Sequence, residues 1–139
     1  MDIQQFPIEL ATAKAKTLRN LSYAAIALSA LYIIESYLTF VILIPFMIIP
    51  FLGYIPLIFL SSIEFLLFIS ATITSVYAII LSSKLTKEIS PISSYIEGIA
   101  IQSGINKSRI FTLIAIALTA LNFIMMLGLN IIKFIFPLA

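Results

Sequence analysis

The chain has 139 residues, of which 62% are hydrophobic and 10% are charged, and its mean hydropathy is +1.19. Its net charge is +2, and it contains no Cys, His or Trp, which excludes disulfides, thiolate nucleophiles, Cys or His metal ligands and an imidazole base. This is the composition of a single membrane domain, residues 1–139, and not of a chain that builds a water-soluble core.

The first element we expect is a short amphipathic helix over residues 7–19, lying in the membrane interface. Pro7 suits a helix start, Glu9 falls in the first turn, and the basic residues follow, an order that complements the helix dipole. These basic residues are Lys14, Lys16 and Arg19. Followed by an apolar run and Ala-Leu-Ser-Ala at 27–30, they also look like a signal peptide. We interpret the run as a retained first membrane helix, with cleavage as the alternative.

The apolar stretch from Leu21 to Ser82 carries only two charges, Glu35 and Glu64. Because about 20 apolar residues already cross a bilayer, this stretch is long enough for more than one pass. The chain is therefore predicted to be an integral membrane protein.

Three prolines divide this stretch, because proline interrupts a helix. Pro45, Pro50 and Pro56 predict an apolar outer loop over 44–56. Transmembrane helices are expected on either side of it, over 21–43 and 57–83. A further helix across 41–60 would give four passes instead of three, and this remains an alternative.

The polar segment 84–109 is expected to form a second amphipathic helix, over 91–103, on the membrane surface. Ser90 followed by Pro91 is a typical helix start. The basic residues of this segment are Lys84, Lys87, Lys107 and Arg109. A third transmembrane helix follows over 110–133.

Basic residues concentrate on the cytoplasmic side of membrane proteins. They precede the first span and lie between the second and third, so we expect a multi-pass protein of the cell membrane with a cytoplasmic N-terminus and an external C-terminus. The predicted fold class is an all-α integral membrane protein with three transmembrane helices and two short interfacial helices.

Small or hydroxylated residues recur at steps of three and four along each span, which favours left-handed helix packing in a bilayer. The predicted packing seam contains Ser22, Ser29, Tyr32, Ser36, Ser61, Ser75, Ser82, Thr112 and Thr119. The three seams are expected to face one another, because lipid is as apolar as Leu and close backbone approach with hydrogen bonds must hold the helices together.

The rare strongly polar residues of the spans are expected to pair, because an unpartnered carboxylate in hydrocarbon costs several kcal/mol. These residues are Glu35, Asn122, Glu64, Asn130 and Lys133. Their depths predict a Glu64–Lys133 contact near the outer surface and a Glu35–Asn122 contact below it.

With no nucleophile, metal cluster or phosphate-binding glycine loop, the chain is not expected to be an enzyme or to hold a cofactor, although bound lipid is compatible with it. We expect a non-catalytic accessory subunit of a respiratory or transport complex, whose partners are lipid and other membrane subunits or copies of itself. One alternative is a homo-oligomeric building block, because the portion from Pro56 to Phe136 resembles conjugation-type pilins in its outline of two apolar helices and a basic loop. Only as a pilin would nucleic acid be an expected partner. The other alternative is a small ion or proton carrier that uses Glu35 and Glu64.

Overall fold

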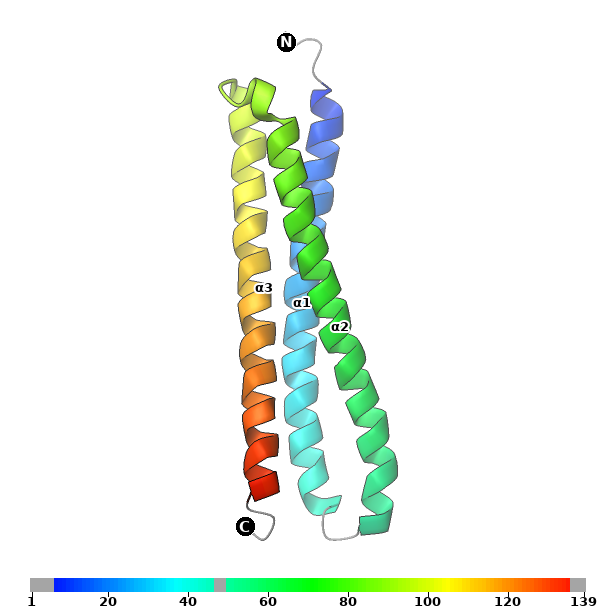
Figure 1. The fold of residues 1–139 in the computed structure, drawn as a ribbon. Helices are drawn as coiled ribbons and strands as arrows, with labels where there is room; N and C mark the ends of the chain where they lie inside the picture. The colour runs from blue at the N-terminus through cyan, green and yellow to red at the C-terminus, as the bar shows by residue number, and fades with distance from the viewer. Residues whose placement is uncertain (1–6, 47–49, 136–139) are drawn as a thin grey trace.

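Three long helices, each antiparallel to the one before it in the chain, make up almost all of the described residues (Figure 1). A computed structural model describes residues 7–46 and 50–135, and the side chains of all of these except 42–46, 50–57, 133 and 134. Helix α1 is Ile8–Phe46, α2 is Pro50–Glu88 and α3 is Ile96–Ile135, with a 3₁₀ turn, η2, at Ser90–Ile92.

The three-pass prediction is confirmed within the described residues. Three helical segments there are long and apolar enough to cross a membrane, Ile8–Val41, Ile58–Glu88 and Ile96–Ile132. The four-pass alternative is excluded. It needs a separate helix across 41–60, but α1 continues to Phe46 and α2 begins at Pro50. This is the architecture of a small multi-pass membrane protein.

The helices run down, up and down through the bundle, so α1 and α3 are parallel and α2 is antiparallel to both (Figure 1). At the end where α2 begins, it leans away from α3 (Figure 1). The helices are longer than a bilayer requires: α1 has 39 residues, which at about 1.5 Å per residue is nearly twice the roughly 30 Å of hydrocarbon.

The predicted interfacial helix at 7–19 is not separate from the first span, because α1 continues without a break from Ile8. The apolar face of residues 8–19 packs inside the bundle, whereas the prediction placed it against the membrane surface. Ala11 and Leu18 are buried against the other two helices. Since no Pro or Gly interrupts residues 8–44, burial of this face keeps the helix straight along the bundle instead of turning it onto the membrane surface.

The predicted loop at 44–56 is also corrected. Its first residues end α1, and Pro50 opens α2; residues 47–49 lie outside the described part. Pro50 fits the first helical position, where no backbone N–H is needed. Pro56 costs one helical hydrogen bond, about 3 kcal/mol. An irregular segment in an apolar environment would leave several backbone groups unsatisfied at several kcal/mol each, so the helix persists.

The second surface helix, expected at 91–103, is divided between η2 and the start of α3, which continues into the third span. The turn is tight. A Cβ on Gly98 would lie 1.8 Å from the Ile92 carbonyl oxygen, so only glycine allows α3 to approach the turn this closely.

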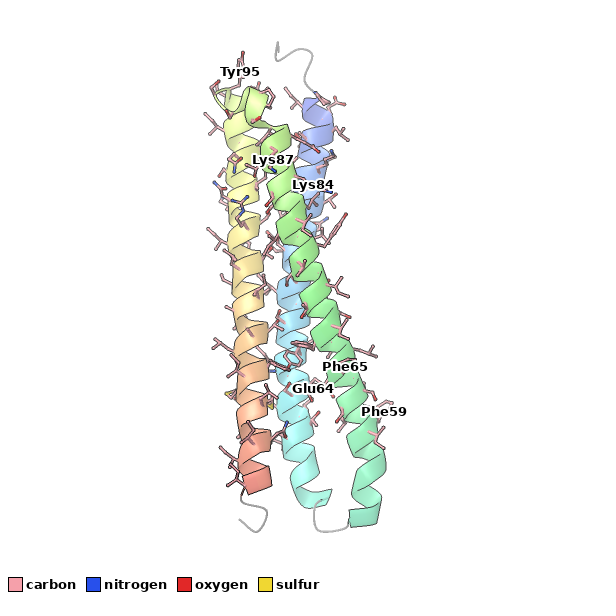
Figure 2. All side chains as sticks on the ribbon, viewed as in Figure 1. Phe59, Glu64, Phe65, Lys84, Lys87 and Tyr95 are labelled. Atoms are coloured by element: carbon pink, nitrogen blue, oxygen red, sulfur yellow. The ribbon has the colours of Figure 1, made fainter. Side chains whose placement is uncertain are left out.

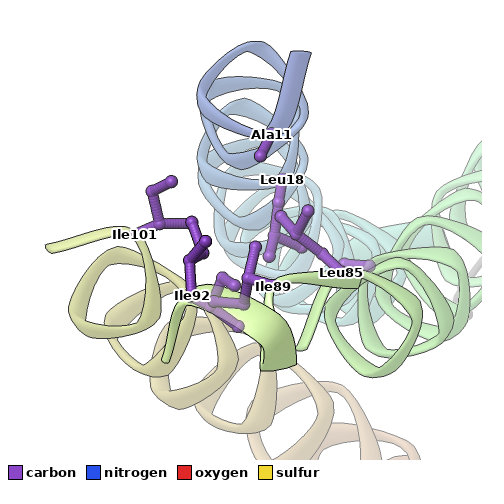
Figure 3. Packing of buried hydrophobic residues seen from close by; sticks show 8 residues of the cluster. Ala11, Leu18, Leu85, Ile89, Ile92 and Ile101 are labelled. Carbon is purple, nitrogen blue, oxygen red and sulfur yellow. The ribbon is translucent and has the colours of Figure 1, made fainter. Parts of the chain in front are cut away.

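A cluster of aliphatic side chains fills the bundle near this turn (Figure 3). Its large, fully buried side chains are Leu18 from α1, Leu85 from α2, Ile89 from the residue between α2 and η2, Ile92 from η2 and Ile105 from α3. We call this part of the molecule, residues 8–19, 85–92 and 96–107, the aliphatic end. Its core resembles that of a water-soluble helical bundle, in which apolar burial drives association.

The core changes from aliphatic to hydroxylated at one level in all three helices. Leu18 is followed one turn later by Ser22, Leu85 is preceded by Ser82, and Ile105 is followed by Ser108; all six are buried. In lipid, helices associate through close approach and hydrogen bonds instead of apolar burial. This change of core is the one expected where a helical bundle passes from water into a membrane.

Candidate functional site

Two hydroxyl clusters join α1 to α3 in a repeating arrangement. The Ser22 hydroxyl lies 3.0 Å from the Ser108 carbonyl oxygen, and Thr112 donates to the Ser22 oxygen at 3.3 Å. One repeat along, Ser29 lies 3.0 Å from the Ala115 carbonyl oxygen and 2.8 Å from the Thr119 hydroxyl. Partners in both clusters are 86 and 90 residues apart, so α1 and α3 keep the same register from one heptad to the next.

A third cluster in this register differs, because a carboxylate from α2 enters it. Asn122 Nδ2 donates to Ser36 Oγ at 2.9 Å. Ser36 Oγ in turn lies 3.0 Å from Glu64 Oε1 and 2.9 Å from the Tyr32 carbonyl oxygen. The Asn122 amide therefore donates to the Ser36 hydroxyl, whose single proton has two acceptors within reach, the Glu64 carboxyl oxygen and the Tyr32 carbonyl oxygen. We call Ser36, Glu64 and Asn122 the polar centre.

Aromatic rings border the polar centre on the side of the hydroxyl clusters. Tyr32 and Phe68 have ring centroids 5.5 Å apart, and Phe68 stacks on Phe123 at 5.0 Å. The Tyr32 side chain is buried and lines the same groove as Glu64. The rings thus separate the polar centre from the hydroxyl clusters and hold α2 against both other helices.

A groove between α2 and α3 opens from the polar centre to the outside of the bundle. Its volume is about 230 Å³, and its lining includes Ser61, Glu64, Phe65 and Asn130. Ser61 and Asn130 are exposed, whereas Glu64 is half-buried and points from α2 near the level where the helices separate (Figure 2). Three polar side chains therefore share a surface that lies within the apolar length of the spans.

The sequence analysis paired Glu35 with Asn122 and Glu64 with Lys133. The first prediction is wrong, and the second is not tested by the described side chains. Among the described side chains, Glu35 and Asn122 do not bond to each other: Glu35 accepts a hydrogen bond from Thr39 on its own helix at 3.4 Å, and Asn122 binds Ser36. The physical reason is that the constant α1–α3 register brings Ser36, not Glu35, to Asn122. The expected Glu64–Lys133 contact involves a side chain outside the described residues.

Most of the predicted seam lies inside the bundle. Its buried members are Ser22, Ser29, Tyr32, Ser36, Ser75, Ser82, Thr112 and Thr119. Ser61 is exposed, because it lies where α2 has left the other helices. The Ser82 hydroxyl donates to the Ile79 carbonyl within α2, whereas the Ser75 hydroxyl has no hydrogen-bond partner among the described residues.

The predicted basic residues gather around the aliphatic end. Lys14 forms an ion pair with Glu88 at 2.8 Å, and Arg109 donates to Thr86 at 3.3 Å. Lys84 and Lys87 project from α2 (Figure 2). Lys107 is exposed on α3. Lys16 and Arg19 line a separate groove between α1 and α3.

Sequence reasoning missed the link between Ser36 and Glu64 and the role of the Ser108 and Ala115 carbonyl groups. The available signal was the common seven-residue repeat of Ser22, Ser29 and Ser36, which matches Ser108, Ala115 and Asn122 at a fixed offset. In the described part of the chain, no group of three or more Asp or Glu residues lies close enough to hold a metal ion.

Comparison of the chain with protein-family models, curated proteins and solved structures finds no match.

Proposed function

We propose that this chain is a non-catalytic membrane subunit that packs within a larger assembly, such as a respiratory or transport complex, and binds a side chain of a partner's transmembrane helix in the groove beside Glu64. The observation that carries the proposal is the position of Ser61, Glu64 and Asn130 on one groove that opens outward between α2 and α3. Lipid chains offer these groups no hydrogen bonds.

The energetic argument concerns the carboxylate first. An ionised carboxylate in hydrocarbon costs several kcal/mol unless a partner compensates it. The Ser36 hydroxyl supports one oxygen of Glu64 from inside the bundle, and the groove leaves the side chain half-exposed on the other side. A hydroxyl, amide or cationic side chain of a neighbouring helix would complete this environment.

The rest of the surface supports the same proposal. Only 22–28% of each span's most apolar window is buried within the bundle, so most of each span must contact lipid or protein. The orientation that we propose places the aliphatic end and its basic residues in the cytoplasm, because basic residues flank spans on that side.

The proposal is tested by purification in mild detergent, followed by measurement of mass and identification of what is retained. The wild type should elute as a complex larger than the monomer. Glu64→Gln should release the partner, whereas Glu35→Gln, the same change at an acid that bonds within α1, should retain it. A monomeric wild type, or equal behaviour of the two variants, would contradict the proposal.

Cross-linking locates the contact, and the chain is suited to it because it contains no Cys. Ser61→Cys places a single thiol in the groove, and Ser62→Cys places one on the adjacent exposed position outside the groove lining. A thiol-reactive photo-cross-linker should capture a partner from position 61 and not from 62. Capture of a second copy of this chain would favour the pilin-like building block over the accessory subunit.

One observation favours ion or proton transport as a second candidate. Asn122 Oδ1 is buried next to the polar centre and has no hydrogen-bond partner among the described residues, so an oxygen is available there for a cation. Proton and sodium flux into vesicles containing the purified protein tests it. Flux that is lost in Glu64→Gln while the complex remains intact would replace the packing function with transport.

A further inference from the structure

We propose that the groove between α1 and α3 at the aliphatic end binds the phosphate headgroup of an anionic phospholipid through Lys16 and Arg19. The groove has a volume of about 560 Å³. It lies at the opposite end of the bundle from the Glu64 groove and does not depend on the partner proposed for that site.

The position of this groove along the bundle matches the headgroup region. The core changes from aliphatic to hydroxylated between Leu18 and Ser22, so Arg19 lies at the membrane boundary. Tyr23 and Tyr77 are exposed just inside this level, where tyrosine typically anchors spans at the interface. Arg109 directs its guanidinium back toward Thr86 at the aliphatic end, as basic side chains do when they reach out of hydrocarbon.

The groove is open because its lining includes small residues. Ala15 from α1 and Ala100 and Gly104 from α3 line it, and a Cβ added at Gly104 would meet no atom within 4 Å. Ile101 also contributes to the lining. Basic pockets between spans on the cytoplasmic side are known sites for anionic lipid headgroups.

The two cations of the groove differ in their charge environment from Lys14 at the same end. Lys14 is neutralised by Glu88, whereas no ion pair involves Lys16 or Arg19 within the described residues. The groove also contains one carboxylate, Glu97. In the α1–α3 register, Glu97 lies farther from the membrane than Lys16 by about 7 Å and than Arg19 by about 12 Å, so the membrane-proximal part is cationic.

A phospholipid is favoured over a soluble anion because the cationic part of the groove faces the membrane boundary. There the headgroup phosphate is held at high local concentration by the bilayer itself, and each cation near the surface contributes to anionic lipid binding. Glu97 and the exposed Thr12 complete the polar lining on the water side.

The test is lipid selectivity of the purified protein in nanodiscs made from phosphatidylcholine with a minority of phosphatidylglycerol as the anionic lipid. Detergent extraction and mass spectrometry then measure the phosphatidylglycerol retained relative to phosphatidylcholine. The wild type should be enriched in phosphatidylglycerol. Lys16→Gln with Arg19→Gln should reduce the enrichment by about fivefold per cation.

The matched control is Lys84→Gln with Lys87→Gln, which removes the same charge from exposed positions outside the groove lining and should reduce the enrichment clearly less than the groove variant does. Glu97→Gln should increase it, which keeps the test informative if the double variant folds poorly. Equal loss in the two double variants, no enrichment in the wild type, or displacement of the lipid by millimolar inorganic phosphate would overturn the proposal.

Discussion

Replacement of Gly98 by Ala tests whether the α2–α3 turn packs as tightly as the structure shows. The new methyl group would lie 1.8 Å from the Ile92 carbonyl oxygen and 2.6 Å from its carbonyl carbon, far inside the 3.0 Å below which such contacts essentially never occur. That oxygen already accepts a hydrogen bond from the Tyr95 amide at 3.0 Å. The backbone must therefore move by more than 1 Å, about the scale at which overpacking costs 1–3 kcal/mol.

Gly104→Ala provides the control, because it has the same effect on helix propensity and meets nothing within 4 Å. Both variants gain about 0.5–1 kcal/mol from propensity, so the difference between them isolates the clash at about 1–3 kcal/mol. Thermal unfolding in detergent, followed by circular dichroism at 222 nm, should show Gly98→Ala melting about 3–10 °C below Gly104→Ala. Equal melting temperatures would refute the close approach of α3 to Ile92.

Three further substitutions, two of them with a control at an exposed position, test the aliphatic core and the hydroxylated core. Leu85→Ala should destabilise the bundle by about 2–5 kcal/mol in a denaturation series, because Leu85 is fully buried in the aliphatic end. Leu66→Ala, at a 63% exposed position, should change stability by less than 0.5 kcal/mol, roughly the level of a surface substitution; similar losses would place the core elsewhere. Ser29→Ala should cost about 1 kcal/mol for its contacts with α3, and the exposed Ser62→Ala close to nothing. Ser75→Ala should be neutral or stabilising, because it removes a buried hydroxyl that lacks a partner among the described residues. A clear loss of melting temperature would contradict this and show that the Ser75 hydroxyl is hydrogen-bonded.

The membrane spans were predictable because the amino-acid composition of a helix depends directly on whether water or lipid surrounds it. Long runs without charge indicate a bilayer, and the spacing of small and hydroxylated residues indicates which face of each helix has neighbours. Ser22 and Ser29 lie buried between helices for this reason. The small-residue spacing alone did not decide whether Asn122 meets the seam residue Ser36 or its neighbour Glu35, because a shift of one residue in the offset between α1 and α3 exchanges the two.

The helix ends were less predictable because proline and glycine have two opposite uses. Pro50 begins a helix and was interpreted as part of a loop. Gly98 lies within α3 and is needed for close packing, not for a turn conformation. In both cases the deciding factor is the surroundings: apolar solvent penalises exposed backbone, and the Ile92 turn occupies the space where a side chain would lie.

The wide sequence separation of the hydroxyl contacts has a consequence for biosynthesis. During translation α1 enters the membrane well before α3 exists, so Ser22 and Ser36 arrive without their interhelical partners. Each of these hydroxyls also lies 2.9 Å from the carbonyl oxygen four residues earlier in its own helix, a bond that α1 can make alone. The newly inserted helix therefore carries no unsatisfied donor at these two positions. The later helices offer each hydroxyl an alternative acceptor, the Glu64 carboxyl group of α2 for Ser36 and the Ser108 carbonyl oxygen of α3 for Ser22.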